Sequence, residues 1–202
     1  MKVRTDAKRE EIMEVAAAVF LEQGYERASM AEIATRVGGS KATLYGYFAS
    51  KEALFLAIIL RLGERYVTPS LAQLEQSTEE DVRTALRRFG EQFLAFITTD
   101  EAVATYRVII SAAAHSDIGR AFFEAGPKIY NDGLARYLSG AMDRRQLRKT
   151  DAAVAAHHFL ALLAHGEMWQ HYFLRELPTL SRAQIKRIVE RAVDAFLSGY
   201  QP

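Results

Sequence analysis

Apolar residues recur along nearly the whole chain at intervals of three and four, a spacing that places them on one face of an α-helix. Alternating β-branched runs bounded by turn residues, which would indicate strands, do not interrupt this pattern. The stripe is clearest near the two ends of the chain, at Ile12, Val15, Ala16, Val19 and Phe20 and again at Ile185, Ile188, Val189, Ala192, Val193 and Phe196. The sequence therefore predicts an all-α fold.

Helix start and stop signals divide the N-terminal part of this pattern. Gly24 is placed to end the first helix in a left-handed conformation, and Gly38 with Gly39 is placed to end the second. Glu32 follows Ser29 at the spacing of a capping box, in which the two side chains accept from each other's backbone N–H groups. Serine hydroxyls are placed to cap three successive helices, at Ser29, Ser40 and Ser50. These signals predict short helices joined by tight turns.

Proline and acidic residues mark the elements of the remaining chain. The helix that follows Ser50 has to end before Pro69, and we expect a loop from there to Ser77. Thr78, followed by three acidic residues, is expected to open the next helix, because the helix dipole favours negative charge in a first turn. Further helices are expected over about 101–114, 117–142 (with a break or kink at Gly126 and Pro127), 151–173 and 181–198.

Composition removes several classes of protein. The chain of 202 residues has no cysteine, which excludes disulfides, thiolate metal sites and cysteine nucleophiles. No apolar run approaches the roughly 18 residues of a membrane helix, so we expect a soluble, cytoplasmic protein with no membrane partner. The net charge is only +1, but residues 37–51 hold two lysines and no acidic residue. A phosphate-binding surface, if present, is therefore expected to be small and confined to this segment.

The segment from Ser29 to Phe48 has the anatomy of a helix-turn-helix, with two short amphipathic helices joined by a glycine turn. Ala34 supplies the small side chain that steeply crossing helices need, and Gly38 accepts the positive φ of the turn. With Ile33, Val37, Leu44 and Phe48 facing inward, the residues left to face outward are Lys41, Thr43 and Tyr47. A second helix presented in this way can enter the DNA major groove. An ordinary corner between two helices would look similar.

Residues 38–55, GGSKATLYGYFASKEALF, closely resemble the signature of the TetR family of transcriptional regulators. The resemblance is strong over about the first 60 residues and rests on helix number and order beyond them. It implies an N-terminal three-helix helix-turn-helix DNA-binding domain over 1–50 and a larger C-terminal helical effector-binding and dimerisation domain over 51–202. The DNA-binding residues it implies are Ser29, Ser40, Lys41, Ala42, Thr43, Tyr45, Tyr47 and Lys51.

The same resemblance assigns roles within this set. Residues 40–43 face bases or adjacent phosphates, the two tyrosines donate their hydroxyls to phosphates, and Lys51 clamps a phosphate beside the free N–H groups of a helix start. The alternatives are a solvated surface position for Lys51 and packing in the three-helix core for Tyr45. Gly39 and Gly46 depart from the family pattern, because these positions often carry an apolar residue and a large DNA-contacting residue, respectively.

The resemblance also implies a homodimer and a small-molecule effector, which we expect to be hydrophobic or aromatic. The residues expected at the dimer interface are Ala155, Phe159, Leu162, Leu163, Ile188, Ala192 and Phe196. Those expected to bind the effector are Tyr66, Phe89, Phe93, Tyr106, Phe122, Phe123, Tyr130, His165 and Trp169. Either set would also serve as an ordinary intramolecular core. The helix that starts at Lys51 is expected to couple the effector to the separation of the two recognition helices.

The sequence thus predicts a ligand-responsive repressor that binds a palindromic operator as a dimer, without catalytic residues, cofactor or metal. One alternative is a helical metal-dependent enzyme that uses His157, His158, His165 and His171 with Glu167, although this helix has no HExxH pattern. The other alternative is a protein-interaction module whose helix-turn-helix contacts a protein. Steep salt dependence would distinguish DNA binding from that module.

Overall fold

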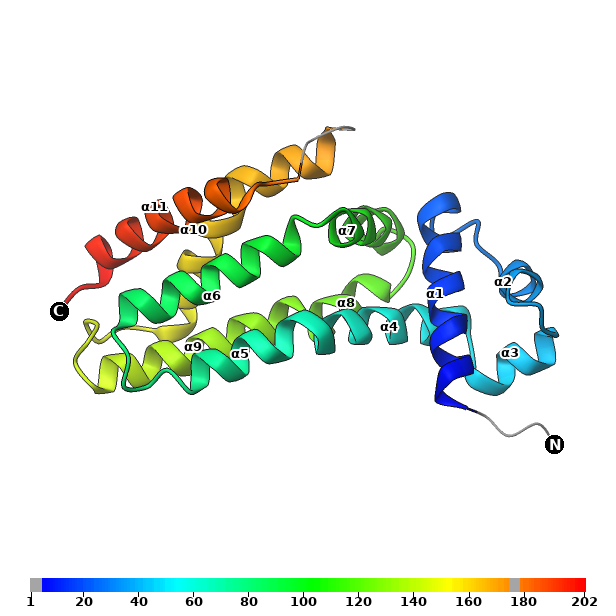
Figure 1. Cartoon of the computed structure of the whole chain (residues 1–202), viewed down its shortest axis with the longest axis horizontal. Helices are drawn as coiled ribbons and strands as arrows, with labels where there is room; N and C mark the ends of the chain where they lie inside the picture. Colours follow the sequence, from blue (N-terminus) through cyan, green and yellow to red (C-terminus); the bar gives the residue numbers. More distant parts are fainter. Residues whose placement is uncertain (1–4, 175–178) are drawn as a thin grey trace. The chain divides into compact units, whose positions relative to one another are not determined.

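The computed structural model describes residues 5–174 and 179–202, apart from the side chains of Glu167 and Trp169. Over these ranges the regular secondary structure is entirely helical, which confirms the predicted all-α fold (Figure 1). The chain divides into two compact units, each with its own hydrophobic core. Unit 1 runs to Leu62 and adds Ala104–Ala125; unit 2 takes Gly63–Val103 and the chain from Gly126 onward.

Unit 1 is built around three short N-terminal helices and a fourth that packs against the first. Its elements are α1 (Asp6–Gln23), α2 (Met30–Arg36), α3 (Lys41–Tyr47), α4 (Lys51–Leu62), most of α7 (Asp100–Ala113) and α8 (Ile118–Ala125). The fully buried side chains Phe20 and Ile33 lie at the centre of its core, and α8 packs against α4. The expected boundary after residue 50 therefore falls inside this unit, because α4 shares its core with α1.

The predicted helix signals of unit 1 are largely confirmed. The hydroxyls of Ser29, Ser40 and Ser50 each accept a bond from the backbone N–H three residues later, at 3.2, 3.1 and 3.1 Å. Gly24 and Gly38 have positive φ values of 80° and 69°. The other half of the predicted capping box, a hydrogen bond from the Ser29 backbone N–H to the Glu32 side chain, was wrong. The Glu32 carboxylate instead accepts from Gln23 Nε2 at 2.6 Å and from Arg36 at 2.9 Å.

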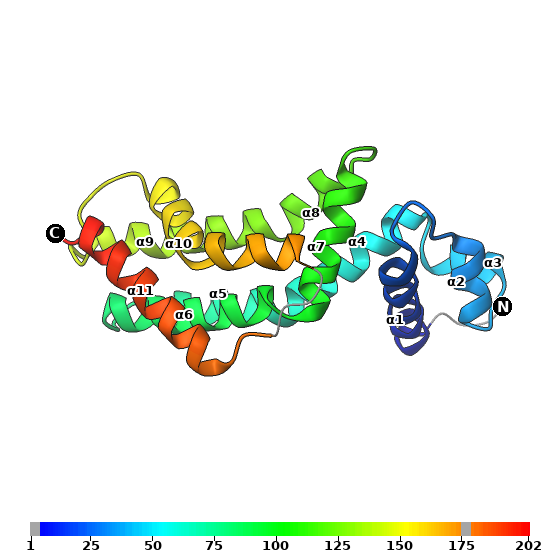
Figure 2. The same ribbon diagram turned by 90° about the horizontal axis from the view of Figure 1, so that it is seen from above.

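Unit 2 is a bundle of longer helices. Its elements are the π-helical turn Gly63–Val67, α5 (Thr68–Glu75), α6 (Val82–Ile97), α9 (Pro127–Asp143), α10 (Ala152–Phe173) and α11 (Arg182–Tyr200). Helix α9 packs against α10, and α11 packs against both α6 and α10 (Figure 2). Close packing requires glycine at Gly90, where an added Cβ would lie 2.9 Å from Val189 Cγ1.

Two expectations for unit 2 were wrong at its start. The predicted loop from Pro69 to Ser77 is mostly helical, because α4 passes through the π-helical turn into α5. Pro69 lies in the first turn of α5, directly after the π-helical turn, and a first turn is the helical position that proline favours. The next helix starts at Val82 rather than near Thr78, and Asp81 caps it by accepting from Thr84 N at 3.2 Å. The predicted break at Gly126 and Pro127 is confirmed.

Among the helices of the described ranges, none on its own is both long and apolar enough to cross a membrane. Residues 41–47 and 51–75 reach the length and apolar composition of a span only together, as a bent pair.

Candidate nucleic-acid interface

Helices α2 and α3 form the predicted helix-turn-helix in unit 1. Gly38 N donates to Thr35 O at 3.1 Å and Gly39 N donates to Ala34 O at 2.9 Å, so the turn closes the end of α2. Ala34 is 3% exposed, as expected for the small residue at the helix crossing. The predicted inner face, Ile33, Val37, Leu44 and Phe48, is buried throughout. The backbone of α3, the second helix of the motif and the predicted recognition helix, is therefore fixed by both the turn and the core.

An ion-pair cluster further ties α2 to α1. The Arg36 guanidinium donates to Glu22 on α1 at 2.6 Å and to Glu32 on α2 at 2.9 Å. The hydrogen bond that Arg36 donates to Glu22, and after it the one donated to Glu32, raise the pKa of Arg36. These groups are solvent-exposed, so their main effect is to orient the two helices rather than to add much stability.

The outward face of α3 begins with small and polar residues. Ser40, Lys41, Ala42 and Thr43 are exposed, and the Ser40 and Thr43 hydroxyls lie 2.9 Å apart. Tyr45 is 51% exposed, so its ring does not pack in the three-helix core, and that alternative is rejected. Ser29 is also exposed, and its hydroxyl caps α2. This surface presents hydroxyl, ammonium and phenol groups from one short helix.

Tyr47 is only partly exposed, unlike the predicted contact residues Ser40 to Thr43 and Tyr45. Its ring packs against the core of unit 1, and its hydroxyl accepts a bond from Thr5 N at 3.1 Å. The expectation that Tyr47 projects freely outward therefore needs correction. The phenolic hydrogen remains a donor, so the predicted phosphate contact is compatible with this position.

Lys51 turns inward, toward the loop between α1 and α2. Its ammonium donates to Tyr25 O at 2.9 Å, Ala28 O at 3.3 Å and Glu26 O at 3.4 Å. It also lies 4.3 Å from the centroid of the Tyr25 ring, within the range of a cation–π interaction. Lys51 is therefore not a freely solvated surface lysine, because its ammonium binds the loop between α1 and α2. To make the predicted phosphate contact, the ammonium has to replace its hydrogen bond to one of these carbonyls with a bond to a phosphate oxygen.

Gly39 leaves a small gap behind the turn. A void of about 10 Å³ lies between Gly39, Val37 and Leu44, and a Cβ added to Gly39 would meet no atom within 4 Å. The absence of the apolar side chain often found at this position in the resembled family is therefore visible as unfilled space. The turn itself forms without it.

Two family models match this chain. One, described as "Bacterial regulatory proteins, tetR family", matches residues 12–58, which include the helix-turn-helix. The other, described as "AefR-like transcriptional repressor, C-terminal domain", matches residues 84–202, more than half of the chain. The chain belongs to the TetR family. The enzyme alternative is rejected, because the TetR family consists of transcriptional regulators.

Relatives of known sequence or structure agree with this assignment. The transcriptional activator FasR of Mycolicibacterium smegmatis is 38% identical over 104 residues, which are 52% of this chain and 46% of FasR. The chain thus spans less than half the length of the first curated relatives it matches. A putative TetR-family regulator from Mesorhizobium loti covers 100% of both chains, with a TM-score of 0.86 and 28% identity. The flavonoid-responsive regulator FrrA covers 98% of this chain and 99% of its own, with a TM-score of 0.76 and 31% identity.

The effector residues predicted for this TetR-family chain fall into separate groups. Phe89, Phe93 and Tyr130 form a buried aromatic cluster in unit 2, with ring centroids 4.9 to 6.0 Å apart. Burial raises the pKa of Tyr130, which keeps its hydroxyl protonated. Tyr106 and Phe122 lie in unit 1 with centroids 4.9 Å apart. These five residues therefore do not line one cavity within a single unit.

The remaining predicted effector residues are scattered. Phe123 is 52% exposed in unit 1, and His165 is exposed on α10 in unit 2. The side chain of Trp169 lies outside the described residues. Tyr66 stacks on Phe96 in unit 2, with ring centroids 4.5 Å apart and an interplanar angle of 17°. Of the predicted set, Tyr66 lines a cavity in unit 2.

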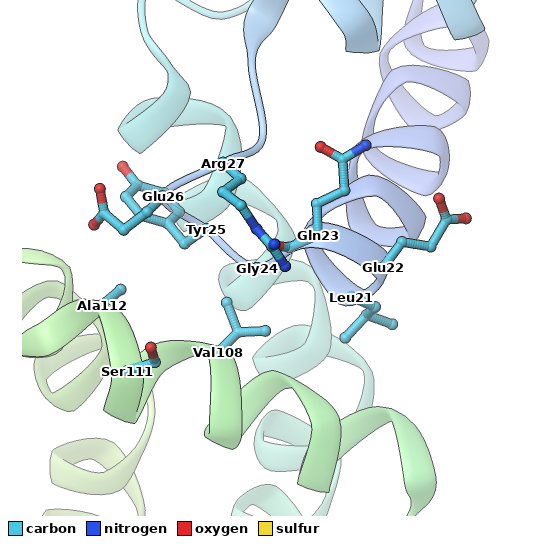
Figure 3. A pocket seen from close by; sticks show the side chains of 10 residues that line it. All are labelled: Leu21, Glu22, Gln23, Gly24, Tyr25, Glu26, Arg27, Val108, Ser111 and Ala112. Carbon is cyan, nitrogen blue, oxygen red and sulfur yellow. The ribbon is translucent and has the colours of Figure 1, made fainter.

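Each unit holds a larger cavity among its described residues. The first, of about 390 Å³, lies between the end of α1, the following loop and α7, and Figure 3 shows the Arg27 side chain extending toward the space beside Val108. Arg27 Nε donates to Gln23 O at 2.9 Å. The second, of about 290 Å³, lies in unit 2 and is lined by Arg65, Tyr66, Pro69, Ser70, Gln92, Ala95 and Phe96. We call it the Arg65 cavity. Its other six residues had no recognisable signal in the sequence.

Most of the predicted dimer residues belong to the core of unit 2 instead. The residues Ala155, Phe159, Leu163, Ala192 and Phe196 are each at most 4% exposed within the unit. Leu162 is 45% exposed and Ile188 is partly exposed. The reason is that α10 is apolar on more than one face, and periodicity does not tell which face meets a second copy. The exposed face of α10 carries Val154 and Ala161 beside Leu162.

The histidines of α10 were the basis of the metal-site alternative. Among the residues whose side chains are described, no group of three or more histidine, aspartate or glutamate residues is arranged to hold a metal ion. His158 Nδ1 instead lies 2.6 Å from the Tyr200 hydroxyl, which joins α10 to α11. His171 is buried, whereas His157 is exposed.

Proposed function

We propose that this chain is a ligand-responsive transcriptional repressor that binds a palindromic operator as a homodimer in the cytoplasm. The observation that supports it most is the exposed surface formed by Ser40, Lys41, Ala42, Thr43 and Tyr45, on a helix whose backbone is fixed by a glycine turn. A rigid helix with short polar side chains at its N-terminal end suits entry into the major groove. The name of the matched C-terminal model favours repression, although FasR is named as an activator.

In this proposal the contacts divide by chemistry. Lys41 and Thr43 are long and short donors suited to base edges or neighbouring phosphates, and Ala42 offers a methyl group. Tyr45 and Tyr47 donate their hydroxyls to phosphate oxygens, which fix the register of the helix without reading sequence. Ser29, at the start of α2, is placed to contact the backbone of the duplex.

Dimerisation supplies the affinity that a single small DNA-binding domain lacks. The exposed stripe Val154, Ala161 and Leu162 supports α10 as the pairing helix, because residues 152–166 contain no aspartate, glutamate, lysine or arginine. Together with α11, two copies would form a four-helix interface about a two-fold axis. The half-sites are then expected one duplex turn apart, about 34–36 Å, or a multiple of it.

A small molecule is proposed to release the operator. Connectivity supports the coupling: α4 follows the recognition helix directly and continues through the π-helical turn into α5, which borders the Arg65 cavity. FrrA is named for its response to flavonoids, and an aromatic effector would also suit the aromatic lining here. Coupling of about 1–3 kcal/mol changes operator affinity by about 5- to 150-fold.

Selection of genomic DNA fragments on the purified full-length protein tests this function. We expect enrichment of a palindromic sequence and protection of two half-sites by footprinting. The logarithm of affinity should fall with the logarithm of salt, with a slope of about −0.9 per phosphate neutralised. Enrichment no better than for random fragments, or binding that barely responds to salt, would reject the proposal in favour of the protein-interaction alternative.

A further inference from the structure

The segment that opens unit 2 has an unusual backbone. Residues Gly63–Val67 form a π-helical turn between α4 and α5. Such turns are rare, are less favourable than an α-helix, and are found frequently at functional sites. A π-turn holds more residues per turn than an α-helix, so consecutive side chains diverge less. Here the turn brings Arg65 and Tyr66 to the same cavity.

One wall of the Arg65 cavity is aromatic and fixed. The Tyr66 ring stacks on Phe96 at 4.5 Å, and Phe96 packs against the core of unit 2, which fixes the orientation of the pair. Pro69 and Ala95 add further apolar surface to the lining. Flat apolar walls of this kind favour a planar ring as ligand. Such a ring gains a large contact area, and because it has no internal rotatable bonds, no internal torsion is restricted on binding.

The same cavity carries one positive charge and no negative one. Arg65 is exposed, and its guanidinium carbon lies 5.1 Å from the centroid of the Tyr66 ring. It takes part in none of the ion pairs found in residues 5–174 and 179–202. The lining contains no aspartate or glutamate. Two other polar side chains of the lining are already hydrogen-bonded: Gln92 donates to Gln73 Oε1 at 2.5 Å, and the Ser70 hydroxyl donates to Val67 O at 3.3 Å.

We propose that the Arg65 cavity binds a planar aromatic acid, with its ring against Tyr66 and Phe96 and its carboxylate on the Arg65 guanidinium. Size permits this, because an apolar cavity of about 150 Å³ holds benzene and this one measures about 290 Å³. A guanidinium presents paired N–H donors that match a carboxylate. The inference names the chemistry of the effector, and it depends on the proposed function only for its consequence at the operator.

Binding of a matched pair of probes tests the proposal without DNA. We would titrate the full-length protein by calorimetry with 2-naphthoate and with its uncharged isostere 2-naphthamide. The acid is expected to bind about tenfold more tightly, because a partly exposed, charge-assisted pair contributes about this much. Arg65→Gln should lower the affinity for the acid to that for the amide and leave the amide unchanged. Arg65→Lys should keep part of the preference.

Two further variants separate the charge from the ring. Tyr66→Leu should weaken both probes equally, because it removes the stacking surface and keeps an apolar side chain. Arg136→Gln, which removes an exposed arginine of the same unit that lies outside the cavity lining and pairs with Glu75 at 3.0 Å, should change neither affinity. Thermal unfolding of each variant checks that unit 2 remains folded.

Several outcomes would overturn the proposal. These are equal binding of the acid and the amide, no binding of either at millimolar concentration, or an unchanged preference for the acid in Arg65→Gln. Binding of the selected operator fragment, measured separately without probe, tests the proposed function independently. A protein that binds naphthoate as expected but no DNA would retain this inference and lose the proposed function, and the converse result would do the reverse.

Discussion

Helices α3 and α10 show two different relations between an apolar pattern and a surface. Helix α3 has seven residues, of which Leu44 is buried, so the remaining side chains have to face outward or lie at the edge. Helix α10 has 22 residues with buried Phe159 and Leu163 on one face and exposed Val154 and Leu162 on another. The one apolar stripe of α3 determines its outward face, whereas the several apolar faces of α10 leave its outward face undetermined.

The difference teaches where function can be inferred from such a chain. On α3 the polar residues left over from packing are themselves the candidate contacts. On α10 the residues chosen for a dimer interface were mostly those that fill the core of the unit. The interface has to be sought among the apolar residues that the core leaves exposed, which requires the structure.

The largest expected effect separates the two faces of α10. Phe159 is fully buried and its ring lies 5.2 Å from that of Phe196, so Phe159→Ala should lower the free energy of unfolding by about 3–5 kcal/mol. Leu162→Ala, three residues along, should lower it by less than about 1 kcal/mol at dissociating protein concentrations. Urea denaturation at one fixed protein concentration measures both. Similar losses for the two variants would contradict the assignment of faces.

Dimer formation should depend on the exposed face. Leu162→Glu places a carboxylate beside the exposed apolar stripe. If two copies pair there about a two-fold axis, it also faces the same carboxylate of the second copy, so we expect the dimer dissociation constant to rise at least about tenfold. Leu60→Glu is a matched control, because Leu60 is 44% exposed on α4. Sedimentation velocity measures the association of each. If Leu60→Glu dissociates the dimer and Leu162→Glu does not, α10 is not the pairing helix.

Lys51 and Lys41 should differ in what they stabilise. Lys51→Met removes a cation that bonds three backbone carbonyls and should lower the free energy of unfolding by about 1–3 kcal/mol. Lys41 is exposed at the start of α3, and Lys41→Met should leave stability within about 0.5 kcal/mol. Hydrogen exchange of residues 24–28 should accelerate only in the first variant. Unchanged exchange there would show that the Lys51 bonds do not hold the loop.

The smallest effect is a gain in stability at the glycine turn. Gly39→Ala should raise the free energy of unfolding by about 0.4–1 kcal/mol, because it restricts the unfolded chain and its methyl group meets open space. Gly38→Ala is the matched comparison and should be destabilising, since Gly38 has a φ of 69°. Thermal unfolding measures both. A loss of stability in Gly39→Ala would mean that the turn needs the freedom of glycine at both positions.

Local signals in the sequence predicted much of unit 1 and less of unit 2. Serine caps and the positive φ of Gly38 depend on neighbours within a few residues, so they could be identified directly. The bonds of Glu32 to Gln23 and of Lys51 to Tyr25 join different elements and have no local signature. The helix that contains Pro69 could not be predicted either. It follows the π-helical turn, and a proline in the first turn of a helix cannot be told from a proline in a loop by sequence.

The central claim is that the exposed face of α3 binds duplex DNA, and the direct test is the affinity of Lys41→Met and Thr43→Val for the selected operator fragment. We expect each variant to bind about 5- to 150-fold more weakly at fixed salt, with unfolding unchanged, because a lost base or phosphate contact removes about 1–3 kcal/mol. Lys149→Met, an exposed lysine in unit 2, is the control. Affinities for the fragment that equal that of the unmodified protein in both α3 variants would contradict the account.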